Sequence, residues 1–489
     1  MNSSKTSISP LVAAFVLLLL MSWLTTGWKP MEDSYISFRY AAHAALGHGF
    51  VFNPGERVEG YTNFLWTALL AGGGIVRWKA IPQIALILEL LFGLGAVWVL
   101  WKWRRSAFAV LLLAVFPGFG DNIGLGLEAA LLAFLLTLGA YCLFDRHRTA
   151  AGSALLGLAF LARPDYGLVG LLLLATAWLA TPKAQRNLGS LLRLVAPWAL
   201  LVAGMELFRF WYYGDVVPNT FHAKAGIDFK YDLALGANSL WFYLKQGGFA
   251  FVVLLVLVAT AARRNIVRLG VVATVAVFVA YDLLVGGPSG NPSRFLAPLI
   301  PLLLAIFPWA NPDRFGRTSP VLLAFATLLG TVATVYAKPA ALDETKNPAV
   351  DIYELVSLAV QPLPAKTSVV FQAIGRVGWE NMQLRLVDPL ALTNRQVARY
   401  GASHPEIPIQ GHRKWMTADQ FFAARPDYYV PFSPGTIKRG RCPDNPTYQP
   451  RPGGPDIAVM SDPRLLRQYT ALSLSADHEG CVLAFRRNP

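Results

Sequence analysis

The chain has 489 residues, of which 54% are hydrophobic and 15% are charged, and its mean hydropathy is +0.43. This balance excludes an ordinary soluble enzyme and predicts a polytopic α-helical membrane protein. The formal net charge is +14, but much of the excess lies in short loops between apolar segments. Basic residues in such loops set membrane orientation, so no nucleic-acid partner is expected.

The chain opens with an apolar run from Leu11 to Leu24 that follows Lys5. Such a run is typical of a signal peptide or of a first membrane span. No small-x-small cleavage site precedes the charged segment after it. We therefore expect a retained span with the N-terminus in the cytoplasm.

The segment from Lys29 to Trp66 is the longest polar, acid-bearing stretch before the C-terminal third. It begins with the adjacent acids Glu32 and Asp33 and continues with histidines, arginines, glycines and aromatic residues. A solvated loop is the plain alternative. Groups of this kind are costly to bury unpaired, however, and acids just beyond a membrane exit lie where a lipid-borne substrate would present its head group. We therefore expect a functional site here.

Membrane spans need about 20 apolar residues, and short basic loops mark the cytoplasmic side. The apolar segment Asn63–Val76 would place the basic cluster Lys102–Arg105 outside if it crossed, so we expect it to lie in the outer interface. The prediction is then about eleven spans, with the N-terminus inside and the C-terminus outside: Leu11–Leu24, Ile81–Trp101, Ala107–Gly120, Leu127–Phe144, Ala151–Ala162, Tyr166–Ala180, Leu191–Trp211, a span ending near Ala262, Val267–Val285, Phe295–Ala310 and Val321–Tyr336.

Hydropathy falls after the last span, so residues 1–337 are expected to form the membrane domain and residues 338–489 a soluble periplasmic domain. The stretch Thr367–Trp379 predicts a buried strand, a glycine turn and the start of a helix, and Gln383–Pro389 predicts a second strand. We expect a small α/β domain. The absence of a GxGxxG pattern does not support a Rossmann nucleotide site.

The three cysteines give little sign of metal chemistry. Cys142 lies in an apolar segment and is interpreted as packing, whereas Cys442 and Cys481 could form a disulfide if their region lies outside the cytosol. No CxxC or His/Cys cluster indicates zinc or iron. No cofactor is expected, and a role for a divalent metal stays open.

The outer loops combine acids with cations. An acid can take a proton from a hydroxyl, and cations can hold a phosphate group. Adjacent side chains diverge, so we favour Asp33 as the base and Glu32 as its electrostatic or hydrogen-bonding companion. The cationic candidates for a phosphate are Arg39, His222, Lys224 and Arg294. Lys224 and Arg294 could instead anchor anionic lipid at the interface.

Other polar residues near the outer boundaries are further candidates. Glu128 opens a span after GLGL, where an acid could be a helix-dipole partner or a site residue. The motif GHRKWM contains His412 and Lys414 and could be a solvated turn or a lid that contacts a phosphate or sugar. Asp165 is interpreted as a turn residue or a partner of Arg163.

The stretch EDSYISFRYAAHAALGHGFVFNPGERVEGYTNFLW, Glu32–Trp66, closely resembles the first outer loop of membrane arabinofuranosyltransferases of the GT-C type. This group contains the terminal arabinofuranosyltransferases of the mycobacterial cell wall and the related pilin arabinosyltransferases. The resemblance covers most of the chain, thinning after Pro434, and recurs at GLGLEAALLAF (124–134), LARPDYG (161–167), YYGDVVPNTFHAKAG (212–226), RFLAPL (294–299), VDPLALTN (387–394) and GHRKWM (411–416).

The resemblance implies a polyprenyl-phosphoryl arabinofuranose donor, an acceptor on the periplasmic side of the bacterial inner membrane, and an essential acid in the first outer loop. Tyr61 and Asn63, inside the matched stretch, join the expected donor-binding residues. The family usually begins this loop with Asp-Asp where this chain has Glu32-Asp33, which favours Asp33. It commonly has Gly-Gly-Asp-Trp-Met where this chain has residues 286–290, GGPSG, so the sugar or acceptor could differ.

The leading hypothesis is a polyprenyl-phosphate-dependent glycosyltransferase. The alternative is a transporter or flippase for a lipid-linked sugar, which would need ionisable groups near the bilayer midplane and inverted repeats. The polar residues cluster instead at one face and no repeat is visible. A sensor or scaffold would leave the acids and cations unexplained. The acceptor stays open among a pilin Ser/Thr, a lipopolysaccharide sugar and an arabinan, and the stereochemistry stays open between inversion and retention.

Overall fold

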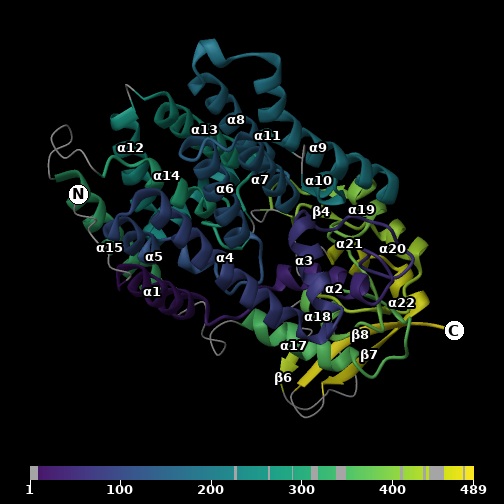
Figure 1. Ribbon diagram of the computed structural model, residues 1–489. Helices are drawn as coiled ribbons and strands as arrows, with labels where there is room; N and C mark the ends of the chain where they lie inside the picture. Colours follow the sequence, from purple (N-terminus) through teal and green to yellow (C-terminus); the bar gives the residue numbers. More distant parts are fainter. Residues whose placement is uncertain are drawn as a thin grey trace.

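A computed structural model describes residues 9–224, 228–262, 265–288, 290–309, 318–337, 348–407, 411–432, 437–439, 456–476 and 480–489. A large helical part contains the elements up to α15, and a smaller part with both helices and strands contains the rest (Figure 1). Helices α2 (Glu32–Ala45) and α3 (Phe64–Gly74) lie between the two parts (Figure 1). The predicted combination of an α-helical membrane protein with a C-terminal α/β region is confirmed.

Six helices of the described chain are long and apolar enough to cross a membrane. They comprise α1 (Ser9–Thr26), α4 (Ile81–Arg104), α9 (Leu188–Tyr213), the kinked pair α11 (Phe229–Tyr243) and α12 (Phe249–Ala262), α13 (Ile266–Leu284) and α15 (Thr318–Ala337). The other predicted spans coincide with shorter helices: α5 (Ala107–Val115), α6 (Ala129–Phe144), α7 (Thr149–Ala162), α8 (Tyr166–Ala180) and α14 (Ile300–Ile306). The protein is therefore a multi-pass membrane protein.

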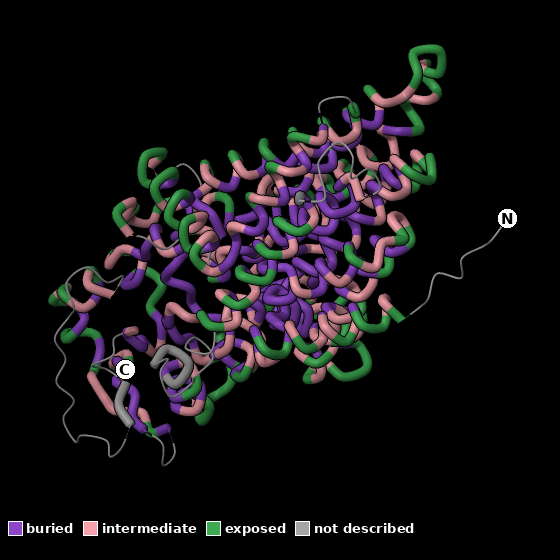
Figure 2. The backbone as a smooth tube through the Cα atoms, turned by 90° about the vertical axis from the view of Figure 1, so that its left-hand side faces the viewer, coloured by how far each residue is buried: buried purple, intermediate pink, exposed green. Residues whose placement is uncertain are grey.

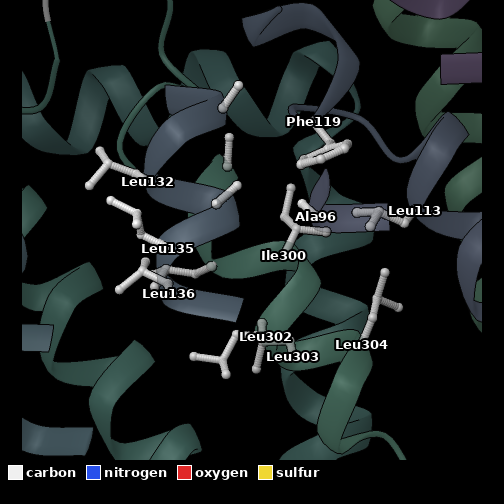
Figure 3. Packing of buried hydrophobic residues seen from close by; sticks show 14 of the residues in the cluster. Ala96, Leu113, Phe119, Leu132, Leu135, Leu136, Ile300, Leu302, Leu303 and Leu304 are labelled. Atoms are coloured by element: carbon white, nitrogen blue, oxygen red, sulfur yellow. The ribbon is translucent and has the colours of Figure 1, made fainter. Parts of the chain in front are cut away.

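Local chemistry explains where the shorter helices differ from the predicted spans. Helix α5 ends at Val115, five residues before the predicted end, because Phe116 precedes Pro117 and takes an extended conformation. Helix α14 is preceded by the 3₁₀ turn Ala297–Leu299, and all seven of its residues are buried. Figure 3 shows α14 packed among side chains of α4, α5 and α6, which accounts for its uninterrupted apolar sequence.

The segment predicted to lie in the interface forms α3, which has 11 residues. At about 1.5 Å per residue this helix is roughly 16 Å long, about half of the hydrocarbon thickness. Helix α3 is therefore too short to cross the membrane completely. Figure 2 shows the buried residues in the centre of the molecule and the exposed ones along its outer face and its ends.

The C-terminal part is built on a six-stranded mixed sheet. Its order is β2 (Arg385–Val387), β1 (Ser368–Val370), β5 (Tyr428–Tyr429), β8 (Gly480–Arg487) and β6 (Ile437–Arg439), and β7 (Tyr469–Ala476) also pairs with β8. Strands β1 and β2 are parallel and are joined through α18 (Ile374–Glu380), as the sequence predicts. The remaining elements are α17 (Pro348–Val360), α19 (Arg395–Tyr400), α20 (Ala418–Ala424), α21 (Ile457–Met460), α22 (Arg464–Gln468) and the hairpin of β3 (Ala402–Ser403) with β4 (Lys414–Trp415). Cys481 is disulfide-bonded, and Cys442 lies outside the described residues.

Helix α2 is fixed to the C-terminal part by two charged side chains that flank α18. The Glu32 carboxylate accepts a hydrogen bond of 2.6 Å from the backbone N–H of Gly375, at the start of α18. The fully buried Arg39 guanidinium donates to the carbonyl oxygens of Gly378, Asn381 and Leu384, at and just beyond its end. The backbone groups at both ends of α18 therefore find hydrogen-bond partners on α2.

Two glycines allow α18 to approach α2 closely. A Cβ added at Gly375 would lie 2.2 Å from the Glu32 carbonyl oxygen, and one at Gly378 would lie 3.3 Å from the Arg39 side chain. The same contact continues in a hydrophobic cluster that joins Ile36 and Tyr40 of α2 to side chains such as Val377 of the C-terminal part. Helix α2 and the C-terminal part therefore share one core.

We predict that Gly375→Ala loosens this contact, because the new methyl group would overlap backbone rather than a flexible side chain. Overpacking of this kind costs about 1–3 kcal/mol, so the melting temperature of the purified protein should fall. Gly72→Ala in α3, where a Cβ meets nothing within 4 Å, is the matched control and should leave the melting temperature unchanged or raise it. Equal melting temperatures for the two variants would contradict the close contact.

Candidate functional site

Helix α2 presents a second face, neighbouring the one that contacts α18, to a cavity of about 550 Å³. Asp33, Ile36 and Ser37 line it, and their spacing of three and four residues places them on one side of the helix. The opposite walls come from the segments that follow α7, α9 and α13 and from Leu392 of the C-terminal part. The charged residues on the wall are Asp33, Arg163, Asp165, Glu206, Arg209, Lys224, Asp232 and Arg294.

Glu128 is the buried acid behind this wall. Its carboxylate accepts hydrogen bonds of 2.9 Å from Arg163, Arg294 and Asn63. Arg163 also contacts Asp165 at 2.7 Å, as the sequence interpretation of Asp165 allowed. Two guanidinium groups are therefore held side by side at the cavity by one carboxylate that is itself 1% exposed.

The loop before Glu128 is held by a second buried acid, Glu89 of α4. Its carboxylate accepts hydrogen bonds of 3.0 Å from the backbone N–H groups of Gly124 and Leu127. Gly124 has a positive φ of 96°, and an added Cβ would lie 2.8 Å from the Trp28 side chain. Glu89 was not among the site residues predicted from the sequence. An isolated acid inside an apolar span is itself a signal of a functional or structural role, and it could have been used.

Lys224 ends the short helix α10 (Asn219–Lys224) and reaches the same cavity. Within the described residues, no carboxylate lies within ion-pair distance of its ammonium group. Burial lowers the pKa of Lys224, and the charge of Asp33 opposes that effect while the charges of Arg163 and Arg294 add to it. These interactions show that the ammonium group lies in the same electrostatic environment as the Asp33 carboxylate and the two guanidinium groups.

A second group of charges lines the cavity on α9. Arg209 contacts Glu59 at 2.6 Å and Glu206 at 2.5 Å, and Glu59 and Arg209 are each 2% exposed. Asp232 of α11 pairs with Arg413 of the GHRKWM motif. These residues were not predicted from the sequence, although Glu206 and Arg209 stand three apart in an otherwise apolar span, which was a usable signal.

The structure brings five of the predicted site residues to the cavity wall and places a sixth, Glu128, directly behind them. The five are Asp33, Tyr61, Asn63, Lys224 and Arg294. The Tyr61 hydroxyl lies 2.9 Å from that of Tyr213.

Five other predicted site residues are not among the described residues on the wall. Glu32 and Arg39 face α18, where all the hydrogen bonds of Arg39 go to oxygen atoms of protein groups. The His222 ring contacts Asp215 at 3.2 Å, and its carbonyl oxygen accepts from the Lys414 ammonium at 3.3 Å. Lys414 therefore contacts α10 through His222. A role for Arg39 or His222 at a bound phosphate stays a prediction.

The wall carries four acids and four cationic side chains, and the combination of Asp33 with Arg163, Lys224 and Arg294 suits proton transfer next to a bound anion. Among the described residues, no group of three or more His, Cys, Asp or Glu side chains could hold a metal ion.

Comparison with solved structures assigns the fold. ArnT from Cupriavidus metallidurans bound to undecaprenyl phosphate matches with a TM-score of 0.54 and 14% identity, covering 99% of this chain and 98% of that chain. The Archaeoglobus fulgidus oligosaccharyltransferase in complex with Zn and sulfate matches with a TM-score of 0.51 and 13% identity, covering 86% of this chain and 67% of that chain. The chain has the GT-C fold of membrane glycosyltransferases.

Sequence comparison is more specific. The terminal beta-(1->2)-arabinofuranosyltransferase of Corynebacterium glutamicum is 32% identical over 264 residues, which are 46% of this chain and 37% of that protein. The enzyme of the same name from Mycobacterium tuberculosis is 31% identical over 223 residues, which are 40% of this chain and 34% of that protein. The resemblance to arabinofuranosyltransferases is confirmed, over little more than a third of the length of these relatives. The family described as "Domain of unknown function (DUF8728)" matches residues 344–475.

We predict that Glu32 makes stability depend on pH. Burial, followed by the charge of Asp33, raises the pKa of Glu32 to about 8, although the N–H groups of Gly375 and Arg376 oppose the shift. Between its unfolded value of 4.5 and about 8, the folded chain holds a proton that the unfolded chain has released. The contribution of Glu32 to stability therefore falls as pH rises through this window and is constant above it.

Glu32→Gln keeps a carbonyl oxygen to accept from Gly375 and removes the titration. Melting temperatures of wild type and Glu32→Gln, measured from pH 5 to pH 9, should diverge in favour of the variant as pH rises. A constant difference across this range would show that Glu32 does not titrate there.

Proposed function

We propose that this protein is a glycosyltransferase that moves arabinofuranose, or a similar sugar, from a polyprenyl phosphate to an acceptor hydroxyl outside the cytoplasm. The observation that carries the proposal is the cavity in which Asp33 shares one space with Arg163, Lys224 and Arg294. The names of the sequence relatives support the sugar. The undecaprenyl phosphate bound to ArnT supports the lipid.

In the proposed reaction Asp33 acts as the general base. The acceptor oxygen forms a bond to the anomeric carbon of the sugar, its proton passes to the Asp33 carboxylate, and the bond from the anomeric carbon to the phosphate oxygen breaks. The polyprenyl phosphate leaves with the electron pair of that bond. A correctly placed general base contributes about 10²–10⁴-fold to the rate of such a step.

The three cations would stabilise the leaving phosphate. Negative charge on the departing oxygen grows during the reaction, and cationic groups fixed in a cavity away from bulk water stabilise it without having to reorient. Glu128 fixes two of these groups, Arg163 and Arg294, through its hydrogen bonds. Lys224 has no carboxylate at ion-pair distance among the described residues, so its charge is the one most available to the phosphate.

We further propose that the chain divides into a membrane domain, residues 1–337, and a periplasmic domain, residues 338–489, in the inner membrane of a bacterium. The loops at the helix ends remote from the cavity are short and basic, with Arg146, His147 and Arg148 in one and Lys183 and Arg186 in another. Such loops favour the cytoplasmic side, which would place the cavity on the periplasmic side. The acceptor would then be a periplasmic protein, such as a pilin, or a cell-envelope glycan.

We predict that Asp33→Asn abolishes transfer in the purified protein, because an amide cannot take the proton. The loss should be about 10²-fold or more, measured as free polyprenyl phosphate released from polyprenyl-phosphoryl arabinofuranose in detergent. A transporter would release none from any variant, because no bilayer is present. Asp419→Asn, which removes an exposed carboxylate outside the cavity wall, is the control and should retain transfer. Full activity of Asp33→Asn would overturn the assignment of the base.

Removal of the Lys224 charge should weaken binding of the donor phosphate. A hydrogen bond to a charged group contributes about 1.5–3 kcal/mol, so Lys224→Met should raise the KM for the donor by about tenfold or more. Lys230→Met removes an exposed lysine six residues along the chain, outside the cavity wall, and should leave the KM unchanged. An unchanged donor KM in Lys224→Met would exclude Lys224 from the phosphate site.

A further inference from the structure

A second cavity, of about 900 Å³, lies at the opposite end of the helices that frame the first. Helices α8, α9 and α13 each line the Asp33 cavity near one end and the second cavity near the other, and Leu127, just before α6, lines the first cavity while Leu143 and Phe144 of α6 line the second. At α9, for example, Glu206 and Arg209 line the first cavity and Arg193 and Leu194 line the second. A helix of 15 residues is about 22 Å long, so the two cavities lie in opposite leaflets of a membrane.

The wall of the second cavity is apolar inside and polar at the mouth. Its apolar part includes Leu143, Trp178 and Leu194. Its polar part includes the Arg193 guanidinium and the His147 imidazole, and none of the described residues that line it carries a carboxylate. The occupant that fits this wall has an anionic group attached to an apolar body.

The surfaces that flank the second cavity are built to face lipid. Leu179 of α8 is 55% exposed, Leu188 of α9 is 70% exposed and Ile266 of α13 is 44% exposed. The rim is held in place by Arg186, which donates hydrogen bonds of 2.9 Å to the carbonyl oxygens of Thr181 and Leu179. A site that opens between lipid-facing helices is reached from the bilayer, which favours a phospholipid over a soluble anion such as a nucleotide.

We propose that the second cavity binds an anionic phospholipid of the leaflet opposite the Asp33 cavity. The headgroup phosphate would lie between Arg193 and His147, and the upper acyl chains would lie against Trp178 and Leu194. Basic pockets between transmembrane helices recognise anionic headgroups in this way. This inference does not rest on the proposed transferase activity.

The test is native mass spectrometry of the full chain, purified in detergent and mixed with equal amounts of phosphatidylglycerol and phosphatidylcholine. Wild type should retain phosphatidylglycerol in preference. Arg193→Gln should reduce that preference about fivefold, the effect of one basic residue at a headgroup. Lys102→Gln removes an exposed cation at the end of α4 that does not line the cavity, and it should match wild type.

A second measurement leaves Arg193 and His147 unsubstituted. Phosphatidylglycerol with brominated acyl chains should quench tryptophan fluorescence of the wild type more than brominated phosphatidylcholine does, and Trp178→Phe should remove the difference. Equal retention of the two lipids, equal behaviour of Arg193→Gln and Lys102→Gln, or quenching that does not depend on Trp178 would each overturn the proposal.

Discussion

The contact between α2 and α18 is the constraint on which the site depends. Glu32 and Arg39 stand seven positions apart, about two helical turns, and they meet the two ends of α18. Both side chains lose hydration in this contact, and a buried polar or charged group is tolerated only when hydrogen bonds replace the lost water. The backbone groups of α18 supply those bonds. Because this fixes the rotation of α2 about its axis, it also fixes where the neighbouring face points, and that face carries Asp33.

The charges around the Asp33 cavity are arranged in pairs rather than scattered. Glu128 balances Arg163 and Arg294 on one side, and Glu59 with Glu206 balances Arg209 on another. Breaking one such buried pair by removing a single partner is strongly destabilising, so the fold maintains the geometry of the cavity. Fixed charges of this kind cost little reorganisation when charge develops on a substrate. Lys224 differs from the arginines because it reaches the cavity from the end of the short helix α10.

The sequence was sufficient to predict a helical membrane protein with a C-terminal α/β region, because both depend on local patterns. The role of Asp33 stays a prediction. The sequence was insufficient for the polar segment 32–45, because the helical period of this segment decides which of its side chains face the cavity and which face α18. Arg39 follows Asp33 by six positions, which places the two about 120° apart on a helix, whereas Glu32 and Arg39 are about 20° apart. Treating residues 32–45 as a loop concealed this difference. The partners of Glu89, Glu59 and Asp232 are distant in the chain, so the sequence could mark the isolated acid Glu89 but could not show which groups these acids contact.

The walls of the cavity also show that the C-terminal part contributes residues to the site. Leu392 lines the cavity directly, and the preceding carbonyl oxygen, of Ala391, accepts a hydrogen bond of 2.8 Å from Asn219 at the start of α10. Arg413, which is 1% exposed, pairs with Asp232 of α11, which also lines the cavity. The segment that carries Lys224 is therefore positioned by residues more than 150 positions later in the chain. A change in the C-terminal part can consequently alter the site without touching any residue that contacts the proposed donor.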